Sequence, residues 1–463
     1  MRVAGKRVAL GAVLLTALLS LALLSACTSQ MSHSPQVKNE LVEQDYDSAL
    51  RLIEKINKST SELLYLYEKG LVLHYDNEWV ESNLALEAAE DLYDDLYTKS
   101  LSRAVGSMFT SDNVLQYRGE RYEAALIHYY KILNYLYLED PGGALVECRK
   151  LNERLTTFVD EADSVYSSDP FLQYLTGMVY LENGELNDAD VSLRAALSAF
   201  KRLGDRYQIE MPPSLYCDLI KCAEARGDLT AAAGYRDSSG RCDTTGVETG
   251  TGTLVLFIEA GYTAHKIERN IVIPIYKDEM DDLGKDDYAV VLTDRYGRPI
   301  DGNRKLSYLL RVAVPELVVT PEPFMDAGVR VFVGERPRGV RAPIVENIDL
   351  LTMEAFEARR GFVMLKTVSR ALAKYLAKKG AESKEIWAGW LVNAFNFATE
   401  SADTRSWATL PQTIRMARIV LPEGAHDVEL TLYGYFVEDD ESFLLEDVNI
   451  TAGRTTFLNL RIY

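Results

Sequence analysis

Residues 171–196 read FLQYLTGMVYLENGELNDADVSLRAA, and their small and aromatic residues recur at helical spacing. The recurring positions follow one another by 3, 4, 5, 4 and 3 residues and are Gly177, Tyr180, Gly184, Ala189, Leu193 and Ala196. Small side chains at such spacing let two helices approach closely, and a glycine between them suits a turn. The stretch therefore predicts two antiparallel helices joined at Gly184.

Weaker copies of this pattern occur on both sides of the stretch. They comprise Gly70, Leu73, Ser82, Leu86 and Ala89; Ile132, Tyr135, Ala144, Cys148 and Leu151; and Ile220, Ala223, Gly227 and Ala232. The pattern resembles the tetratricopeptide repeat (TPR), a helical hairpin that stacks on its neighbours. Because the copies are unevenly spaced, we expect an irregular TPR-like α-helical solenoid over residues 37–236.

Tyrosines gather in the predicted repeats. The candidates for a groove that binds a peptide or protein are Tyr129, Tyr130, Tyr135, Tyr137 and Tyr180. Tyrosine suits such a groove because it offers a large contact area at a low entropic cost. The alternative is that the same rings pack one helix on another.

A β-rich half follows a Ser-, Thr- and Gly-rich linker at residues 237–252. Strands are predicted at 254–259, 270–275, 288–294, 316–320 and 329–333. Helical periodicity returns at about 345–400, where basic residues accompany an apolar face. Such a helix covers a sheet or lies on a membrane surface. The chain is thus expected to be multidomain α + β, with a mixed α/β half over residues 253–463.

Residues 412–463 alternate as strand, turn, strand, strand, turn, strand. The predicted strands are 414–421, 427–433, 443–448 and 455–462, with a turn at Pro422-Glu423-Gly424. This segment resembles the β-sandwich modules of the PEGA type, which implies a small terminal β-sandwich.

The first 26 residues have the features of a secretory signal peptide. Arg2, Lys6 and Arg7 precede an apolar run that ends in Leu24-Ser25-Ala26-Cys27. This ending resembles the bacterial lipobox, which implies cleavage before Cys27 and attachment of diacylglycerol and palmitate to that residue. Thr28 after the lipidated cysteine implies sorting to the outer membrane, facing the periplasm. Residues 27–36 are then a lipidated tether.

The block Ala402-Asp403-Thr404-Arg405-Ser406-Trp407 precedes the terminal strands. Together with the lipobox, the repeats and the β-rich end, it resembles an uncharacterised family of bacterial TPR-like lipoproteins. Asp403 and Arg405 can form a charge-assisted pair while Trp407 fills the junction between helix and sheet. The alternatives are a structural latch and a ligand site.

Charge and residue types exclude several kinds of function. A net charge of −19 repels phosphate backbones, so we expect no nucleic acid partner. No spacing typical of a catalytic, nucleotide-binding or metal-binding motif occurs, and we expect no catalytic residue, cofactor or metal. Beyond Cys27, the sequence leaves open a disulfide between Cys222 and Cys242, with Cys148 packed as a small apolar residue.

These observations favour an outer-membrane lipoprotein that acts as a non-enzymatic scaffold or assembly factor. Its helical repeats would bind other envelope proteins. A first alternative is a protein that binds peptidoglycan or another polysaccharide through its β-rich half. A second is an envelope hydrolase that uses paired carboxylates.

Overall fold

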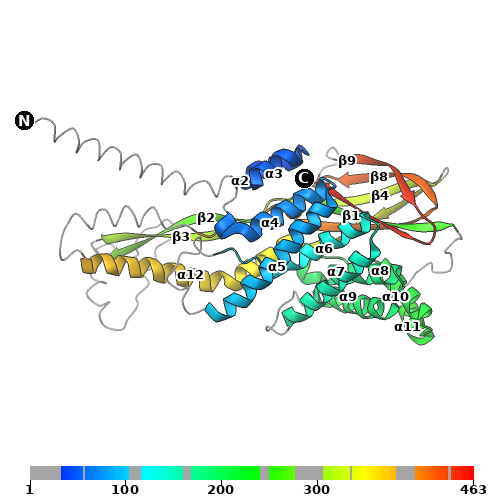
Figure 1. Cartoon of the computed structure of the whole chain (residues 1–463), viewed down its shortest axis with the longest axis horizontal. Helices are drawn as coiled ribbons and strands as arrows, with labels where there is room; N and C mark the ends of the chain where they lie inside the picture. The colour runs from blue at the N-terminus through cyan, green and yellow to red at the C-terminus, as the bar shows by residue number, and fades with distance from the viewer. Residues whose placement is uncertain are drawn as a thin grey trace, which may run out of the picture.

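The computed structural model shows a helical N-terminal part followed by a β-rich C-terminal part (Figure 1). It describes residues 33–55, 58–103, 116–159, 168–239, 250–276, 306–333, 336–381, 402–435 and 440–463. The predicted signal peptide, the predicted lipid site at Cys27 and the strand predicted at 288–294 lie outside these ranges. Within them, no helix has both the length and the apolar character needed to span a membrane.

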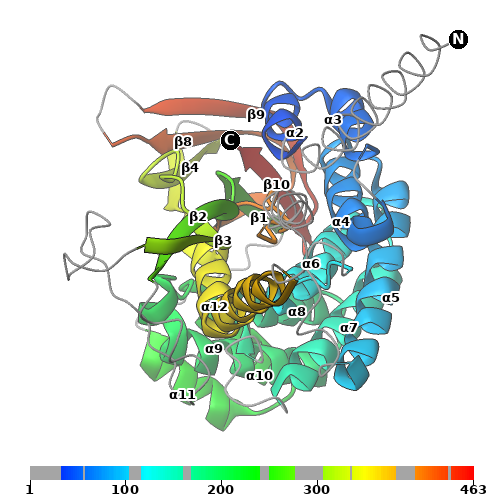
Figure 2. The ribbon, with the colours of Figure 1, turned by 90° about the vertical axis from the view of Figure 1, so that its left-hand side faces the viewer.

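The helical part is an array of antiparallel hairpins that curves around a β-sheet (Figure 2). Its helices are α2 (His33–Val42), α3 (Tyr46–Ile53), α4 (Lys58–Tyr75), α5 (Trp79–Arg103), α6 (Arg121–Tyr137), α7 (Pro141–Val159), α8 (Pro170–Glu182), α9 (Leu186–Tyr207), α10 (Ser214–Ala225) and α11 (Leu229–Ser239). From α4 onward, each even-numbered helix pairs with the next one. The predicted helical hairpins at residues 70–89, 132–151, 171–196 and 220–232 coincide with these pairs.

Two of the hairpins are packed through equivalent residues. A Cβ atom on Gly70 would lie 2.5 Å from the Leu86 side chain, and one on Gly177 would lie 2.6 Å from that of Leu193. Between α8 and α9, Gly184 forms the turn with a φ of 76°, which favours glycine. The predicted turn at Gly184 is confirmed, and the residue of α9 that lies against Gly177 is Leu193.

The β-rich part contains two four-stranded sheets and a separate hairpin. Its strands are β1 (Thr251–Ala260), β2 (His265–Tyr276), β3 (Leu306–Val318), β4 (Asp326–Val333), β5 (Arg336–Arg341), β6 (Ile344–Asn347), β7 (Thr413–Pro422), β8 (Gly424–Tyr433), β9 (Glu441–Ile450) and β10 (Thr455–Ile462). The first sheet has the order β10-β1-β7-β6, the second has the order β5-β4-β8-β9, and β2 pairs with β3.

Alternate residues of β1 belong to two different cores. Leu254, Leu256 and Ile258 pack between the two sheets. Val255 and Phe257 belong to a core that also contains the helices from α4 to α10. A strand buried on both faces accounts for the nearly unbroken apolar run in its sequence. The layers are therefore the helical array, the first sheet and the second sheet.

The predicted terminal module at residues 412–463 is not self-contained. Of its four strands, β7 and β10 lie in the first sheet and β8 and β9 in the second, and strands from residues 251–347 complete both sheets. The cause is long-range pairing, because β1 pairs with both β7 and β10 while β4 pairs with β8. Nor are the two halves separate, since one apolar core extends from Leu63 of α4 to Phe457 of β10.

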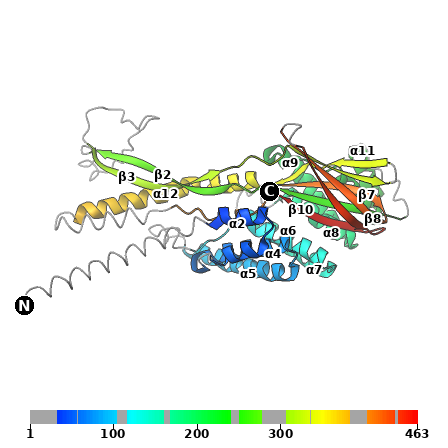
Figure 3. The same cartoon turned by 90° about the horizontal axis from the view of Figure 1, so that it is seen from above.

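An arm made of β2, β3 and α12 (Ile348–Ala381) projects from this body (Figures 1 and 3). α12 packs along β3, so the amphipathic segment does cover a β-structure. It is the described part of the helices predicted at 345–400, and residues 382–401 lie outside the described ranges.

Candidate interaction site

The concave side of the helical array is filled by the first sheet. Glu259 of β1 is completely buried and accepts a hydrogen bond from the Tyr129 hydroxyl of α6 at 2.8 Å. It also accepts one from the Asn459 amide of β10 at 2.9 Å and one from the Tyr75 hydroxyl of α4. The same Asn459 side chain accepts a hydrogen bond from the Tyr137 hydroxyl of α6 at 2.7 Å.

The prediction of an open tyrosine groove is therefore wrong for Tyr129, Tyr130 and Tyr180. Tyr129 and Tyr130 are completely buried, and so is nearly all of Tyr180. Tyr135 packs against Gly143 at the α6–α7 turn instead of lining a hollow. The chain's own strands lie against Tyr129 and Tyr137, where a bound peptide would have to lie.

The block at residues 402–407 lies between the array and the sheet. Arg405 donates from Nε and Nη2 to the two carboxylate oxygens of Asp403, each at 2.8 Å, so the predicted ion pair is present. Burial opposes ionisation of Asp403, but the hydrogen bonds and charge of Arg405 outweigh it and hold the pKa below its ordinary value. The pair therefore keeps its charges in a partly buried place.

Trp407 is the anchor of this block. Its ring is completely buried and stacks on Tyr67 of α4, with the ring centroids 4.5 Å apart. Its backbone N–H donates to the buried Glu123 carboxylate of α6 at 2.9 Å. Two residues later, the Thr409 hydroxyl donates to Glu68 of α4. The block thus joins the terminal strands to two helices of the array, as a latch would.

A buried network of charged residues joins α5, α6 and α7. Lys131 of α6 lies at its centre, with its Nζ 2.9 Å from Glu90 of α5 and 3.0 Å from Glu147 of α7. Glu87 also pairs with Lys131, and Lys150 adds a second ammonium group 3.2 Å from Glu90. Burial opposes ionisation of Glu90 and Glu147, but their cationic and hydrogen-bonding neighbours hold both pKa values below the ordinary range.

Glu90, His128 and Glu147 have the residue types of a metal site, with ligand atoms within 4.8 Å of one another. The ring of His128 already has partners at both nitrogens. Nδ1 lies 2.9 Å from Glu147, and Nε2 accepts from Arg154 at 3.2 Å. Burial lowers the pKa of His128, which favours the neutral ring. Because the ammonium groups of Lys131 and Lys150 already pair with both glutamates, this arrangement fits a structural ion network better than a metal centre.

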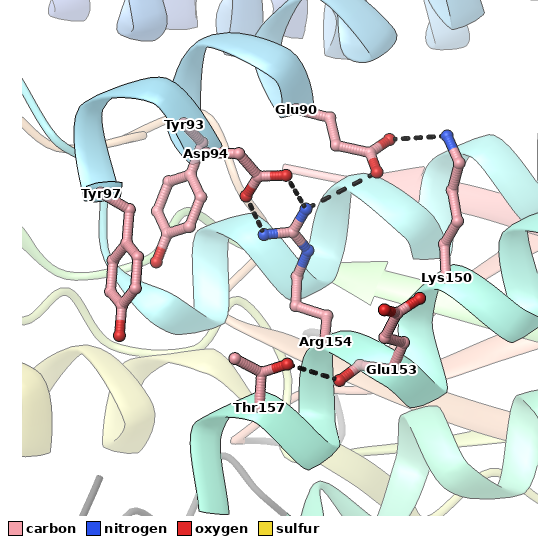
Figure 4. A pocket seen from close by; sticks show the side chains of 8 residues that line it. All are labelled: Glu90, Tyr93, Asp94, Tyr97, Lys150, Glu153, Arg154 and Thr157. Carbon is pink, nitrogen blue, oxygen red and sulfur yellow. Dashed lines mark hydrogen bonds and ion pairs between the residues drawn. The ribbon is translucent and has the colours of Figure 1, made fainter. Parts of the chain in front are cut away.

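A hollow of about 230 Å³ opens beside the network, between α5 and α7 (Figure 4). It is lined by Glu90, Tyr93, Asp94, Tyr97, Lys150, Glu153, Arg154 and Thr157. Arg154 donates to both carboxylate oxygens of Asp94, at 2.8 and 3.2 Å, and lies 3.6 Å from Glu90. Arg154 thus pairs with Asp94 and Glu90, and Lys150 pairs with Glu90, while these lining residues include no nucleophile paired with a base.

This network was not predicted from the sequence. A signal was present in the sequence, because each helix carries charged residues at helical spacing. The acidic residues of α5 are complemented by basic residues on α6 and α7. The spaced residues are Glu87, Glu90 and Asp94 on α5, His128 and Lys131 on α6, and Glu147, Lys150 and Arg154 on α7. Which helices face each other could not be deduced from the spacing alone.

The cysteines differ from the predicted pairing. Cys222 is a free buried thiol, so it does not bond to Cys242. Among the cysteines of the described ranges, Cys217 is disulfide-bonded. Cys148 is free and completely buried among apolar residues, as predicted for a packing position.

No family model and no curated relative matches the sequence. Among solved structures, BtubC (BKLC) from P. vanneervenii is 16% identical, with a TM-score of 0.29, over 42% of this chain and 69% of its own. PilW, a type IV pilus biogenesis factor, is 16% identical, with a TM-score of 0.23, over 46% of this chain and 92% of its own. Neither likeness is close enough to carry an argument about fold or function.

Proposed function

We propose that the protein is a non-enzymatic, TPR-like scaffold of the bacterial envelope. In this proposal a lipid on Cys27 anchors it in the outer membrane, and the outer face of the helical array binds another envelope protein. The absence of enzymatic activity is part of the proposal. It is supported by the charge network between α5, α6 and α7, whose ionisable groups are engaged with one another.

A row of exposed apolar residues carries the proposal. Leu84, Val146 and Val191 are 68%, 47% and 60% exposed. They occupy the same place in three successive hairpins. Each lies 14 residues after the first residue of its repeat pattern, which is Gly70, Ile132 or Gly177. Single exposed apolar residues are ordinary on protein surfaces. Here, however, one exposed apolar residue recurs at the same position of each neighbouring hairpin, and such a recurring apolar position favours an interaction surface.

The position of the row supports binding on the outside of the array. All three residues lie on the second helix of a hairpin, namely α5, α7 and α9. The first helices, α6 and α8, contact the sheet, and Figure 2 shows α5 and α7 outside them. Because the inner side is occupied by the sheet, a partner would bind on the outer helices.

Site-specific crosslinking in intact cells tests the proposal. A photoreactive residue at Leu84, Val146 or Val191 should give one common crosslinked protein. The matched control positions are Phe332, Val420 and Leu444, which are comparably exposed but lie on the β-sheets. Crosslinks to that protein from the control positions alone would overturn the proposal.

A substitution series separates binding from stability. Leu84→Ser, Val146→Ser and Val191→Ser together should abolish the crosslinked product of a probe at Val80, another exposed residue of α5. The unfolding free energy should change by less than about 0.5 kcal/mol for each exposed site. Binding of peptidoglycan by the full chain, with no protein crosslink at the row, would favour the polysaccharide-binding alternative.

The anchor has its own test. Cys27→Ser should abolish incorporation of a labelled fatty acid, because the thiol is the atom that accepts the lipid. Metabolic labelling followed by immunoprecipitation measures this incorporation. Cys217→Ser, at a cysteine far along the chain, should keep the label. Label on the Cys27→Ser protein would show that Cys27 is not the lipid-attachment residue.

A further inference from the structure

The arm carries a charge opposite to that of the whole molecule. Residues 358–381 of α12 contain seven Lys and Arg and no Asp or Glu, within a chain of net charge −19. The seven are Arg359, Arg360, Lys366, Arg370, Lys374, Lys378 and Lys379. Such segregation in an acidic protein gives α12 an electrostatic preference for anionic surfaces that the body lacks.

The basic residues of α12 are arranged by helical period. Lys366, Arg370, Lys374 and Lys378 follow one another by four residues, a spacing that places them along one side of a helix. Leu365, Val368, Leu372, Tyr375 and Leu376 recur at spacings that place them along another side. α12 is thus a basic amphipathic helix, and it packs along β3.

The N-terminal helix fixes the arm near the predicted lipid. The Tyr262 hydroxyl, just before β2, donates to the backbone carbonyl of Lys38 in α2 at 2.8 Å. Lys38 also places its ammonium 4.6 Å from the centre of the Tyr262 ring. α2 is therefore attached at the base of the arm, and the arm leaves the body from the end at which α2 lies (Figures 1 and 3).

Lengths then decide what the arm can reach. The residues between Cys27 and His33 span at most about 20 Å when fully extended. The strands of the arm extend about 40 Å at ~3.3 Å per residue, and α12 extends about 50 Å at ~1.5 Å per residue. The tether is shorter than the arm. Whenever the arm points toward the lipid, it therefore touches the bilayer.

We propose that the arm binds an anionic phospholipid surface through residues 358–381 of α12. The proposal rests on the proposed lipid anchor for its geometry, but the electrostatic contact needs no lipid on Cys27. Arg359 and Arg360 pair with Glu120 and Glu357. The basic residues from Lys366 onward contact the headgroups, while the acidic body is turned away by repulsion. Lipid and arm together then hold the molecule in one orientation on the membrane, with the outer face of the array open to a partner.

Vesicle flotation with the unlipidated chain that begins at Thr28 tests this inference. This chain keeps every described residue. It should float with phosphatidylcholine vesicles that contain roughly 30% phosphatidylglycerol, and not with phosphatidylcholine alone. Binding should fall at least about tenfold between about 50 mM and about 500 mM salt, since salt screens the contact.

Charge-matched variants locate the contact. Lys366→Gln, Arg370→Gln, Lys374→Gln and Lys378→Gln together should lower vesicle affinity at least about tenfold. The control removes the same charge from the array, through Arg149→Gln, Lys201→Gln, Arg202→Gln and Lys221→Gln, and should leave affinity within about twofold. Far-ultraviolet circular dichroism checks that both proteins stay folded.

Equal affinity of the two variants, or equal binding to neutral vesicles, would overturn the inference. Retention of the protein on isolated peptidoglycan, without binding to vesicles, would also overturn the inference, because the arm would then bind a polysaccharide. Failure of vesicle binding leaves the labelling of Cys27 unaffected, so the arm and the anchor are judged separately.

Discussion

Lys131 is the residue on which the buried charges of the array depend. Its side chain is 1% exposed and lies within ion-pair distance of Glu87, Glu90 and Glu147. Lys131→Met keeps the length of the side chain but leaves Glu90 and Glu147 without the central charge. Removing one partner of a buried ion pair leaves an uncompensated charge, so we expect a loss of about 3–5 kcal/mol in the unfolding free energy by denaturant titration.

Lys150→Met is the matched control for that prediction. Lys150 pairs with the same three glutamates, but its side chain is 32% exposed. Water can replace much of its contribution, and the loss should be about 1 kcal/mol or less. Equal losses for the two variants would mean that Lys131 is not the central cation of the network.

Asp169 and Glu346 bring two acidic side chains together where the array meets the sheet. Asp169 caps α8 by accepting from the Leu172 N–H at 2.8 Å, and Glu346 lies on β6. Burial raises the pKa of Asp169 to about 6. Burial and the neighbouring Asp169 carboxylate raise the pKa of Glu346 well above its ordinary value. The folded state therefore binds more protons here than the unfolded state does.

That difference sets the sign of a pH dependence. The contribution of the pair to stability is fully present below the unfolded pKa values near 4 and is lost as the pH rises through about 6 and above. Glu346→Gln removes the repulsion. The difference in unfolding free energy between the variant and the natural protein should grow in favour of the variant, by on the order of 1–3 kcal/mol, as the pH rises from about 5 to about 8. Denaturant titrations at both pH values measure this gain, and a constant difference between the two proteins would contradict the sign.

At the scale of elements, the helical hairpins were the most predictable feature because their information is local. Gly177, Gly184 and Leu193 lie close to the α8–α9 connection in sequence, so spacing predicts both helices and the turn between them. Exposure along the hairpin was less predictable. Ser192 suits an exposed position by residue type, yet it is buried and accepts a hydrogen bond from Asn152 of α7 at 3.2 Å. That contact depends on how one hairpin stacks on the next.

Two glycine-to-alanine changes in helices should have opposite effects. At Gly177, a Cβ atom would lie 2.6 Å from the side chain and 3.3 Å from the backbone nitrogen of the buried Leu193. Gly177→Ala should therefore lower stability by about 1–3 kcal/mol through overpacking. At Gly234 in α11, nothing lies within 4 Å of such an atom. Gly234→Ala should raise stability by up to about 1 kcal/mol, since alanine favours helix. Thermal unfolding measures both changes, and a stabilising Gly177→Ala would disprove this hairpin register.

At the scale of the whole molecule, the positions of the strands could be predicted but not their partners. Alternation located the four terminal strands to within a few residues, because each strand carries its own pattern. The parallel pairing of β1 with β10 joins segments at opposite ends of the β-rich part. Only the apolar run from Leu254 to Ile258 hinted at a strand covered on both faces. The helical array covers the second face of this strand, and no local sequence pattern predicts which element covers it.

Trp407 tests whether the array and the sheets are one cooperative unit. Two separate domains joined by a latch predict that Trp407→Ala loosens the β-rich part and leaves the melting of the array unchanged. The shared core predicts otherwise, because the Trp407 ring stacks on Tyr67 of α4 while its backbone is bound by Glu123 of α6.

Truncating this buried ring should therefore lower the unfolding free energy of the whole molecule by about 3–5 kcal/mol. Helical ellipticity and proteolysis of the β-sheets should report the same, lower midpoint, as expected for one two-state transition. If the ring served a ligand instead, stability would be nearly intact and crosslinking to the partner would be lost. Two separate transitions in the variant would restore the two-domain description, since only a divided core allows one half to unfold while the other stays intact.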